Sequence, residues 1–214
     1  MGNHNLSEKR HFSFIGYRGA GKSTLLKLLK KEFLKHKEDN LSGAISKLRF
    51  FSLDQVCKNS MGETIEDAVS KKGWPFFRQV EKDQLKKLLG NENICLIDCG
   101  GGVVEDRQNR LLLKQKSWVF FIDTKIDLLV SRQLKSPRIS LDVKNPYSED
   151  LAKSIKKETE SHLEKRLPWY RECADVTVCD VEKKEKFDEL FSFIFKKFLE
   201  IVENEKQGSV KHGR

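Results

Sequence analysis

One short stretch decides the fold of this chain: Gly16-Tyr17-Arg18-Gly19-Ala20-Gly21-Lys22-Ser23. It fits the phosphate-loop pattern G-x-x-x-x-G-K-[ST]. The apolar run His11 to Ile15 precedes it and indicates a strand, and Lys22 to Lys35 follows with leucines at helical spacing. Because the motif sits between a strand and a helix, as it must to bind phosphate, the sequence predicts a site for a nucleoside triphosphate.

The residue types in this loop suit a triphosphate and a metal ion. Glycines allow successive backbone N–H groups to face an anion, and the following helix adds positive charge at its N-terminus. Lys22 is predicted to reach the β- and γ-phosphates, and the Ser23 hydroxyl to bind Mg²⁺. The residues predicted to contact the nucleotide here are Gly19, Ala20, Gly21, Lys22, Ser23 and Thr24.

The rest of the chain alternates strands with helices, which predicts a three-layer α/β/α sandwich around a five-stranded parallel sheet. A polar N-terminal extension (1–10) and a polar C-terminal tail (203–214) are expected to flank one domain, 11–202. The segment 135–150 breaks the periodicity and contains two prolines, which favours a mobile lid. The predicted strands are 11–15, 48–53, 93–97, 117–122 and 174–179, and the predicted helices are 22–35, 63–71, 75–89, 105–114, 126–134, 149–167 and 184–202.

Composition narrows the possible functions. The 214 residues carry a net charge of +9, with lysines spread along the chain, which is more typical of solvated helix faces than of a nucleic-acid site. The sequence contains no apolar run long enough to cross a membrane and no apolar export segment near its start. We therefore expect a cytoplasmic protein with reduced cysteines, without a nucleic-acid or membrane partner.

Three further groups follow the phosphate loop in order along the chain. Asp54 ends one strand, Arg78 opens a helix, and Gly100-Gly101-Gly102 follow another strand. The carboxyl edge of such a sheet is where ligands bind. Structural alternatives stay open: Asp54 as a helix N-cap, Arg78 paired with Glu81 on a helix face, and Arg166 as a solvated cation.

Together these motifs resemble the shikimate kinase family over about residues 12–199. The resemblance rests on the phosphate loop, Asp54, Phe77-Arg78 with Glu81, the three glycines, and Arg166-x-x-x-Tyr170 followed by Ala174-Asp175. It implies transfer of the γ-phosphate of ATP to the 3-hydroxyl of shikimate, with Mg²⁺, in chorismate and aromatic amino acid biosynthesis. Monomers are usual in the family, so a monomer is expected.

The resemblance also implies roles for individual residues. Asp54 would bind the ring hydroxyls and accept the proton of the attacking hydroxyl, while Lys22 and a lid arginine would contact the phosphates. Arg78 and Arg166 would hold the carboxylate of shikimate. The backbone of Gly100, Gly101 and Gly102 would contact the ring.

The sequence departs from the family pattern in two places. Ser52 stands where a second carboxylate is usual, and Asp98 ends the strand before the glycines. We hypothesise that Asp98 takes over the Mg²⁺ role together with Ser23; the alternative is a strand-end aspartate that bonds the loop backbone. The lid reads Ser-Pro-Arg rather than Arg-Pro, so Arg138 is the candidate phosphate ligand, and Arg132 is a candidate to stack on adenine.

Alternative functions remain open at this point. A related small-molecule kinase of the gluconate type would also use a carboxylate-binding arginine pair. A non-catalytic, nucleotide-binding relative is favoured by Ser52 and the altered lid, and opposed by Lys22, Asp54 and both arginines. A nucleic-acid-binding ATPase rests on the net charge alone.

Overall fold

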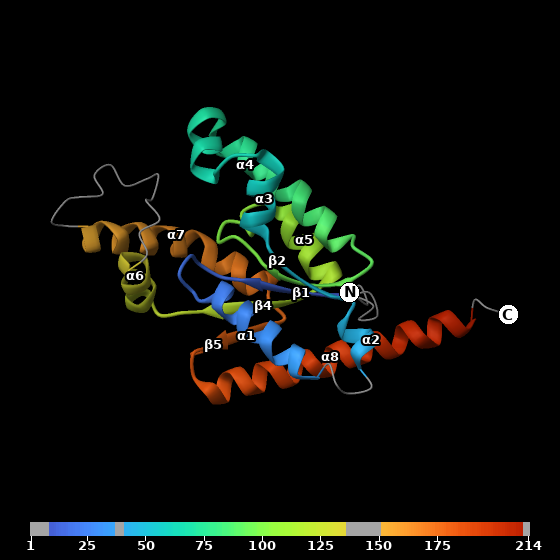
Figure 1. The fold of residues 1–214 in the computed structure, drawn as a ribbon. Helices are drawn as coiled ribbons and strands as arrows, with labels where there is room; N and C mark the ends of the chain where they lie inside the picture. Colours follow the sequence, from blue (N-terminus) through green and yellow to red (C-terminus); the bar gives the residue numbers. More distant parts are fainter. Residues whose placement is uncertain (1–8, 37–40, 136–150, 212–214) are drawn as a thin grey trace.

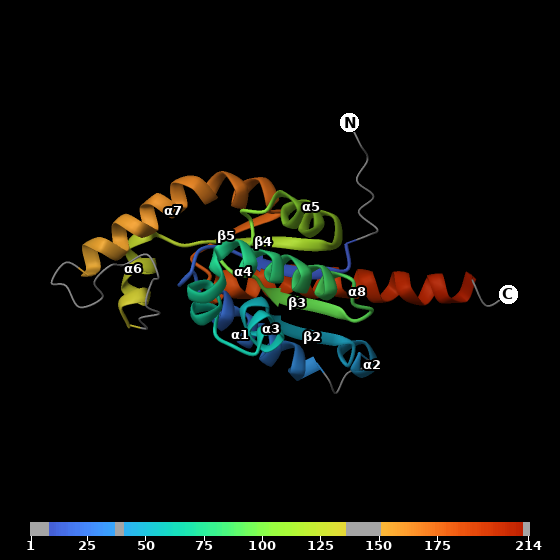
Figure 2. The ribbon, with the colours of Figure 1, turned by 90° about the horizontal axis from the view of Figure 1, so that it is seen from above.

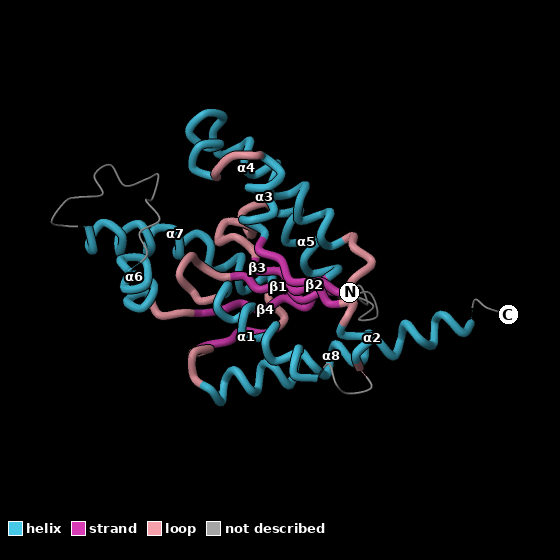
Figure 3. The backbone as a smooth tube through the Cα atoms, viewed as in Figure 1, coloured by secondary structure: helices cyan, strands magenta, loops and turns pink. Residues whose placement is uncertain are grey.

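A parallel sheet of five strands in the order β2-β3-β1-β4-β5 forms the centre of the molecule (Figures 1 and 3). The computed structural model describes residues 9–36, 41–135 and 151–211. Its elements are β1 (His11–Ile15), α1 (Lys22–Lys35), α2 (Ser42–Ile45), β2 (Leu48–Ser52), α3 (Leu53–Met61), α4 (Ile65–Leu89), β3 (Ile94–Asp98), α5 (Arg107–Lys116), β4 (Ser117–Asp123), α6 (Ile126–Lys135), α7 (Leu151–Cys173), β5 (Val176–Cys179) and α8 (Lys184–Lys211). The predicted three-layer α/β architecture is confirmed.

The central strands are those with continuous apolar runs. Every residue of β1 and β3 is buried, and β1 pairs with β3 on one side and with β4 on the other. Strands that are covered on both faces need apolar side chains on both, which explains why these runs do not alternate. Because all pairs are parallel, the carboxyl ends of β1, β2 and β3 lie along one edge of the sheet.

Helices cover both faces of the sheet and form two cores (Figures 1 and 2). On one face, α1 and α8 pack against the sheet around Phe33, Phe120 and Phe198. On the other face, α3, α4, α5 and α7 contribute Leu53, Leu85 and other apolar residues. Because both faces of the sheet are buried, the register of each strand is fixed. The residues that follow the strand ends therefore have defined positions at the edge of the sheet.

Several helices differ from the sequence predictions. Helices α2 and α3 were not predicted, and Leu53–Met61 of α3 follows β2 without any break. Helix α7 continues through Pro168 to Cys173 rather than ending at Leu167. Proline costs one backbone hydrogen bond, but the next turn is anchored because the Tyr170 ring stacks on Phe121 at 5.0 Å. The break expected near Gly73 is confirmed, since Gly73 has φ 81° inside α4.

The polar tail expected from residue 203 is a helix as far as Lys211, because α8 continues beyond Val202 and projects past the sheet (Figure 1). Glu205 explains part of this extension, since its carboxylate pairs with Arg10 at 2.8 Å and with Lys47 at 3.1 Å. The predicted end of the last helix at 202 is therefore wrong, whereas the division of the chain into one domain and a tail stays a prediction. Most of the predicted N-terminal extension and nearly all of the predicted lid lie outside the described residues.

Among residues 9–36, 41–135 and 151–211, no helix has the length and the apolar character that a membrane crossing requires.

Candidate active site

The phosphate loop leaves β1 through a turn that only glycine fits. Gly16 has φ 142°, and a Cβ there would lie 2.7 Å from the carbonyl oxygen of Ile122. Helix α1 then begins at Lys22 with no acidic residue in its first turn, so its positive N-terminal end is not neutralised locally. The buried Lys22 ammonium donates to the carbonyl oxygens of Gly16 (2.8 Å) and Tyr17 (3.1 Å), which keeps its charge inside the loop.

A cavity of about 460 Å³ opens in front of this loop, and we call it the loop cavity. It is lined by the phosphate loop and the start of α1, by strand ends, and by α6 and the segment after β5. Of the predicted nucleotide residues, Gly19, Gly21, Lys22, Ser23, Thr24 and Arg132 line it. Ala20 is buried behind the loop, where its carbonyl oxygen accepts a hydrogen bond from Thr124.

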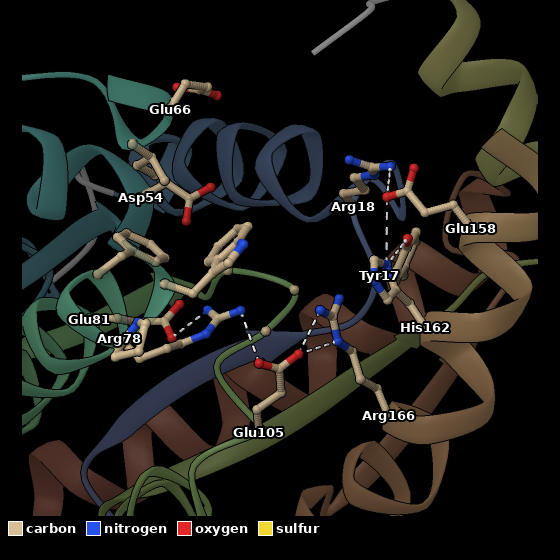
Figure 4. A pocket seen from close by; sticks show the side chains of 17 residues that line it. Tyr17, Arg18, Asp54, Glu66, Arg78, Glu81, Glu105, Glu158, His162 and Arg166 are labelled. Atoms are coloured by element: carbon tan, nitrogen blue, oxygen red, sulfur yellow. Dashed lines mark hydrogen bonds and ion pairs between the residues drawn. The ribbon is translucent and has the colours of Figure 1, made fainter. Parts of the chain in front are cut away.

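A second cavity of about 520 Å³ lies beside the first, and we call it the arginine cavity (Figure 4). Its charged lining consists of three arginines and five carboxylates: Arg18, Arg78, Arg166, Asp54, Glu66, Glu81, Glu105, Glu158. Apolar side chains of α4 complete the wall. The predicted substrate residues Asp54, Arg78, Arg166 and the three glycines are thus brought together here.

Asp54 stands at the junction of the two cavities, because it lines both. It belongs to the first turn of α3, and Ser52 rather than Asp54 is the N-cap residue of that helix. The N-cap alternative for Asp54 is therefore wrong. Arg18, Gly100 and Gly101 also line both cavities, so a group bound in one cavity can meet a group bound in the other at this point.

The three glycines after β3 form the wall between the cavities, and each one makes room for a different neighbour. A Cβ on Gly100 would lie 2.8 Å from a carboxylate oxygen of Asp54, and one on Gly101 would lie 3.3 Å from the backbone nitrogen of Arg18. A Cβ on Gly102 would collide with the guanidinium of Arg78. Any larger residue here would displace the site groups themselves.

The two arginines predicted to bind an acid converge from different helices. Arg78 on α4 donates to Glu81 at 2.9 Å and pairs with Glu105 at 3.1 Å. Arg166 on α7 contacts Glu105 through Nε (2.7 Å) and Nη2 (2.6 Å), and its side chain is only 14% exposed. The Arg78–Glu81 pair that was an alternative is present, and Arg166 is not a solvated cation. Figure 4 shows Glu105 between the two guanidinium groups.

Glu81 is the one buried acid of this cluster. Burial raises its pKa to about 7; the Arg78 guanidinium opposes this shift, and the charges of Asp54 and Glu105 add to it. The Glu81 carboxyl group holds the Arg78 guanidinium from the buried side of the cavity.

Asp98 and Ser23 meet at the ends of β3 and the phosphate loop. The Ser23 hydroxyl donates a short hydrogen bond to the Asp98 carboxylate, and both residues line the loop cavity together with Ser52. No cluster of three His, Cys, Asp or Glu side chains that could hold a metal alone occurs in the described part of the chain. A hydroxyl beside a carboxylate fits Mg²⁺, which takes its other ligands from phosphate and water.

The candidate lid residues are placed only in part. Arg132 of α6 lines the loop cavity and donates to the carbonyl oxygen of Gly19 at 3.0 Å. Its stacking on adenine stays a prediction. Arg138 lies outside the described residues.

Several charged and aromatic residues of the arginine cavity were missed by the sequence analysis. The Tyr17 hydroxyl lies 3.0 Å from Nδ1 of His162, and Arg18 donates to Glu158 at 2.6 Å. Glu105 was also missed. Each of these contacts joins segments far apart in the sequence, so no local pattern could have shown them.

The fold, the loop and the paired cavities define a phosphate-loop α/β protein with a second, arginine-lined cavity beside the loop. The family model described as shikimate kinase matches residues 40–202. The chain therefore belongs to the shikimate kinase family, a family of ATP-dependent kinases.

Individual relatives agree with this assignment. The shikimate kinase of Syntrophus aciditrophicus is 29% identical over 86% of this chain and 90% of its own length. That of Persephonella marina is 28% identical over 79% of this chain and 88% of its own length. The solved shikimate kinase from Acinetobacter baumannii, in complex with shikimate, has a similar fold; it is 24% identical, with a TM-score of 0.68, over 91% of this chain and 96% of that chain.

Proposed function

We propose that this protein is a shikimate kinase that transfers the γ-phosphate of ATP to the 3-hydroxyl of shikimate. The observation that carries the proposal is the position of Asp54, which lines the cavity of Lys22 and also the cavity of Arg78 and Arg166. A carboxylate at that junction can face the hydroxyl of an acceptor on one side and the end of a triphosphate on the other. Family membership supports the choice of acceptor.

The paired arginines support a carboxylic acid as the acceptor. Guanidinium groups bind carboxylates through planar forks, and two of them approaching from α4 and α7 fix both position and orientation. Phosphoryl transfer depends mainly on such positioning and on the neutralisation of charge. The arginine cavity would therefore hold the acid end of the ring while Asp54 accepts the proton of the attacking hydroxyl.

The loop side of the site supplies positive charge for the triphosphate. Lys22 and the first residues of α1 line the loop cavity together with Gly19 and Gly21, and the N-terminus of a helix adds positive charge there. Ser23 and Asp98 would hold Mg²⁺, which neutralises phosphate charge when it is bound. We assign Arg132 to the nucleotide and leave Arg138 as the candidate lid arginine.

A coupled ADP-release assay with ATP and Mg²⁺ tests this function. We expect release to depend on shikimate and to be much slower without it. Release stimulated only by another polyol acid, such as gluconate, would assign the acceptor to the related kinase class. Binding of ATP and shikimate without turnover would make the protein a non-catalytic relative, which Ser52 in place of a carboxylate favours.

A further inference from the structure

The carboxylates of the arginine cavity raise a problem for any acid that enters it. Each arginine of the cavity is already paired with a carboxylate: Arg18 with Glu158, Arg78 with Glu81 and Glu105, and Arg166 with Glu105. Five carboxylates against three arginines leave the cavity negative when all of them are ionised. An acid ligand must therefore compete for its arginines with groups of the protein itself.

Among these competing groups, Glu105 has the position that an acid ligand would take. Its two carboxylate oxygens divide between the arginines, since Oε2 lies 3.1 Å from Arg78 and Oε1 lies 2.6 Å from Arg166. It also takes both the Nε and the Nη2 donors of Arg166, which form the edge that would bind a ligand carboxylate in bidentate fashion. Figure 4 shows this carboxylate between the two guanidinium groups.

Glu105 is also the partner that can leave most easily. Its side chain is 34% exposed, whereas that of Glu81, the other partner of Arg78, is 1% exposed. Its backbone is fixed, because its N–H donates to Gly102 at 3.0 Å and its carbonyl oxygen accepts from Arg110 at 3.3 Å. Rotation of the side chain alone would break its contacts with both arginines without any movement of the main chain, and Arg78 would keep only its pair with Glu81.

We propose that Glu105 is an internal competitor in the acceptor site: its carboxylate occupies the position between Arg78 and Arg166, and the acid group of the acceptor binds by displacing it. This inference rests on the proposed function, because it takes the arginine cavity as the acceptor site. Competition of this kind weakens every acid ligand by the same factor. The concentration at which each acid binds therefore rises, and acids that gain further contacts, such as ring hydroxyls at Asp54, still bind at concentrations where simple acids do not.

The test compares Glu105→Gln with the unchanged protein in steady-state kinetics. The amide keeps the size of the side chain and removes its charge. We expect the KM for shikimate to fall roughly threefold to tenfold, while the KM for ATP and kcat change little. An unchanged or increased KM for shikimate would overturn the proposal, because a residue that merely braces the arginines would weaken binding when it is removed.

Glu66→Gln is the matched control. Glu66 lines the same cavity, and no ion pair joins it to Arg78 or Arg166 within the described residues. It therefore reports the effect of removing one negative charge without freeing the arginines. An equal fall in KM in both variants would contradict displacement and indicate a general charge effect.

Salt dependence gives a second readout. In the unchanged protein one carboxylate replaces another, so ionic strength has little effect on acceptor binding. In Glu105→Gln an anion meets Arg166 without its carboxylate partner and Arg78 paired with Glu81 alone, so we expect the KM for shikimate to rise more steeply with salt. An equal dependence of the KM for shikimate on salt concentration in the two proteins would overturn displacement.

A binding experiment separates this inference from the proposed function. If neither protein turns over shikimate, the kinase proposal has failed, and a titration with cyclohexanecarboxylate followed by NMR decides the inference alone. This ring acid has no hydroxyl to phosphorylate and requires only the two arginines. Tighter binding to Glu105→Gln supports displacement; equal affinity, or no binding to either protein, overturns it.

Discussion

Asp54 is the residue on which the chemistry depends, because it borders both cavities. We expect Asp54→Asn to reduce kcat by roughly 10²- to 10⁴-fold, since the amide cannot accept the proton of the attacking hydroxyl. The KM for ATP should stay within about twofold, because the phosphate loop is unchanged. Steady-state kinetics measure both values. The control is Asp83→Asn, which changes an exposed aspartate on α4. An equal loss of kcat in this control would contradict the role assigned to Asp54.

Asp98 carries the hypothesis about the metal ion. Its carboxylate accepts a hydrogen bond from Ser23, so Asp98→Ala would leave the hydroxyl without its charged neighbour. We expect the Mg²⁺ concentration for half-maximal activity to rise by roughly 10- to 100-fold. Asp123→Asn changes another aspartate at the end of a strand and should leave the Mg²⁺ titration unchanged. An unaltered Mg²⁺ titration for Asp98→Ala would contradict a role of Asp98 in binding the metal ion.

Glu81 makes stability depend on pH. Its pKa is about 7 in the folded protein against an ordinary value of 4.5, so between these values the folded state holds a proton that the unfolded chain has released. The free energy of unfolding therefore falls as pH rises from about 4.5 to about 7, by roughly 3 kcal/mol from this group. Urea denaturation at several pH values measures the free energy of unfolding. We expect this free energy to fall less with rising pH in Glu81→Gln than in the unchanged protein. Parallel curves for the two proteins would contradict this origin of the pH dependence.

At the scale of single elements, the glycine segment after β3 positions the site by leaving room. We expect Gly102→Ala to fold, because the added methyl group meets the flexible end of Arg78 rather than backbone. Displacement of Arg78 should raise the KM for shikimate by roughly tenfold, which corresponds to the loss of about one charged hydrogen bond. The KM for ATP should change little. Gly43→Ala in α2, where a Cβ meets nothing within 4 Å, should change neither value. An unchanged KM for shikimate in Gly102→Ala would separate Arg78 from acceptor binding.

Elements were predictable from the sequence where a local pattern defines them. The phosphate loop, the strand runs and the break at Gly73 follow from spacing and residue type. The ends of α7 and α8 did not follow, because each is held by distant partners: Tyr170 packs on Phe121, and Glu205 pairs with Arg10 and Lys47. Tertiary contacts there override the local signals of Pro168 and of the polar residues after Val202.

The whole molecule places these elements in a way that the sequence only partly predicted. Alternating strands and helices predicted a parallel sheet, but the order β2-β3-β1-β4-β5 depends on how each connection crosses the sheet. This order puts the ends of β1, β2 and β3 side by side, so the phosphate loop, Asp54 and the glycines meet. Residues that belong to motifs, such as Lys22, Asp54 and Arg78, could be predicted from the sequence and line the cavities. Glu158 and His162 could not, because the packing of α7 brings them into the arginine cavity. Glu105 follows the glycines closely, but its pairing with Arg78 of α4 and Arg166 of α7 is a tertiary contact that no local pattern shows.

The most direct test of phosphoryl transfer to shikimate is ³¹P NMR of a reaction containing the protein, ATP, Mg²⁺ and shikimate. The account predicts a new phosphomonoester signal, coupled to the ring proton at carbon 3, that grows as the γ-phosphate signal of ATP declines. A phosphate on a different hydroxyl, or ATP loss to inorganic phosphate that is the same with and without shikimate, would contradict it.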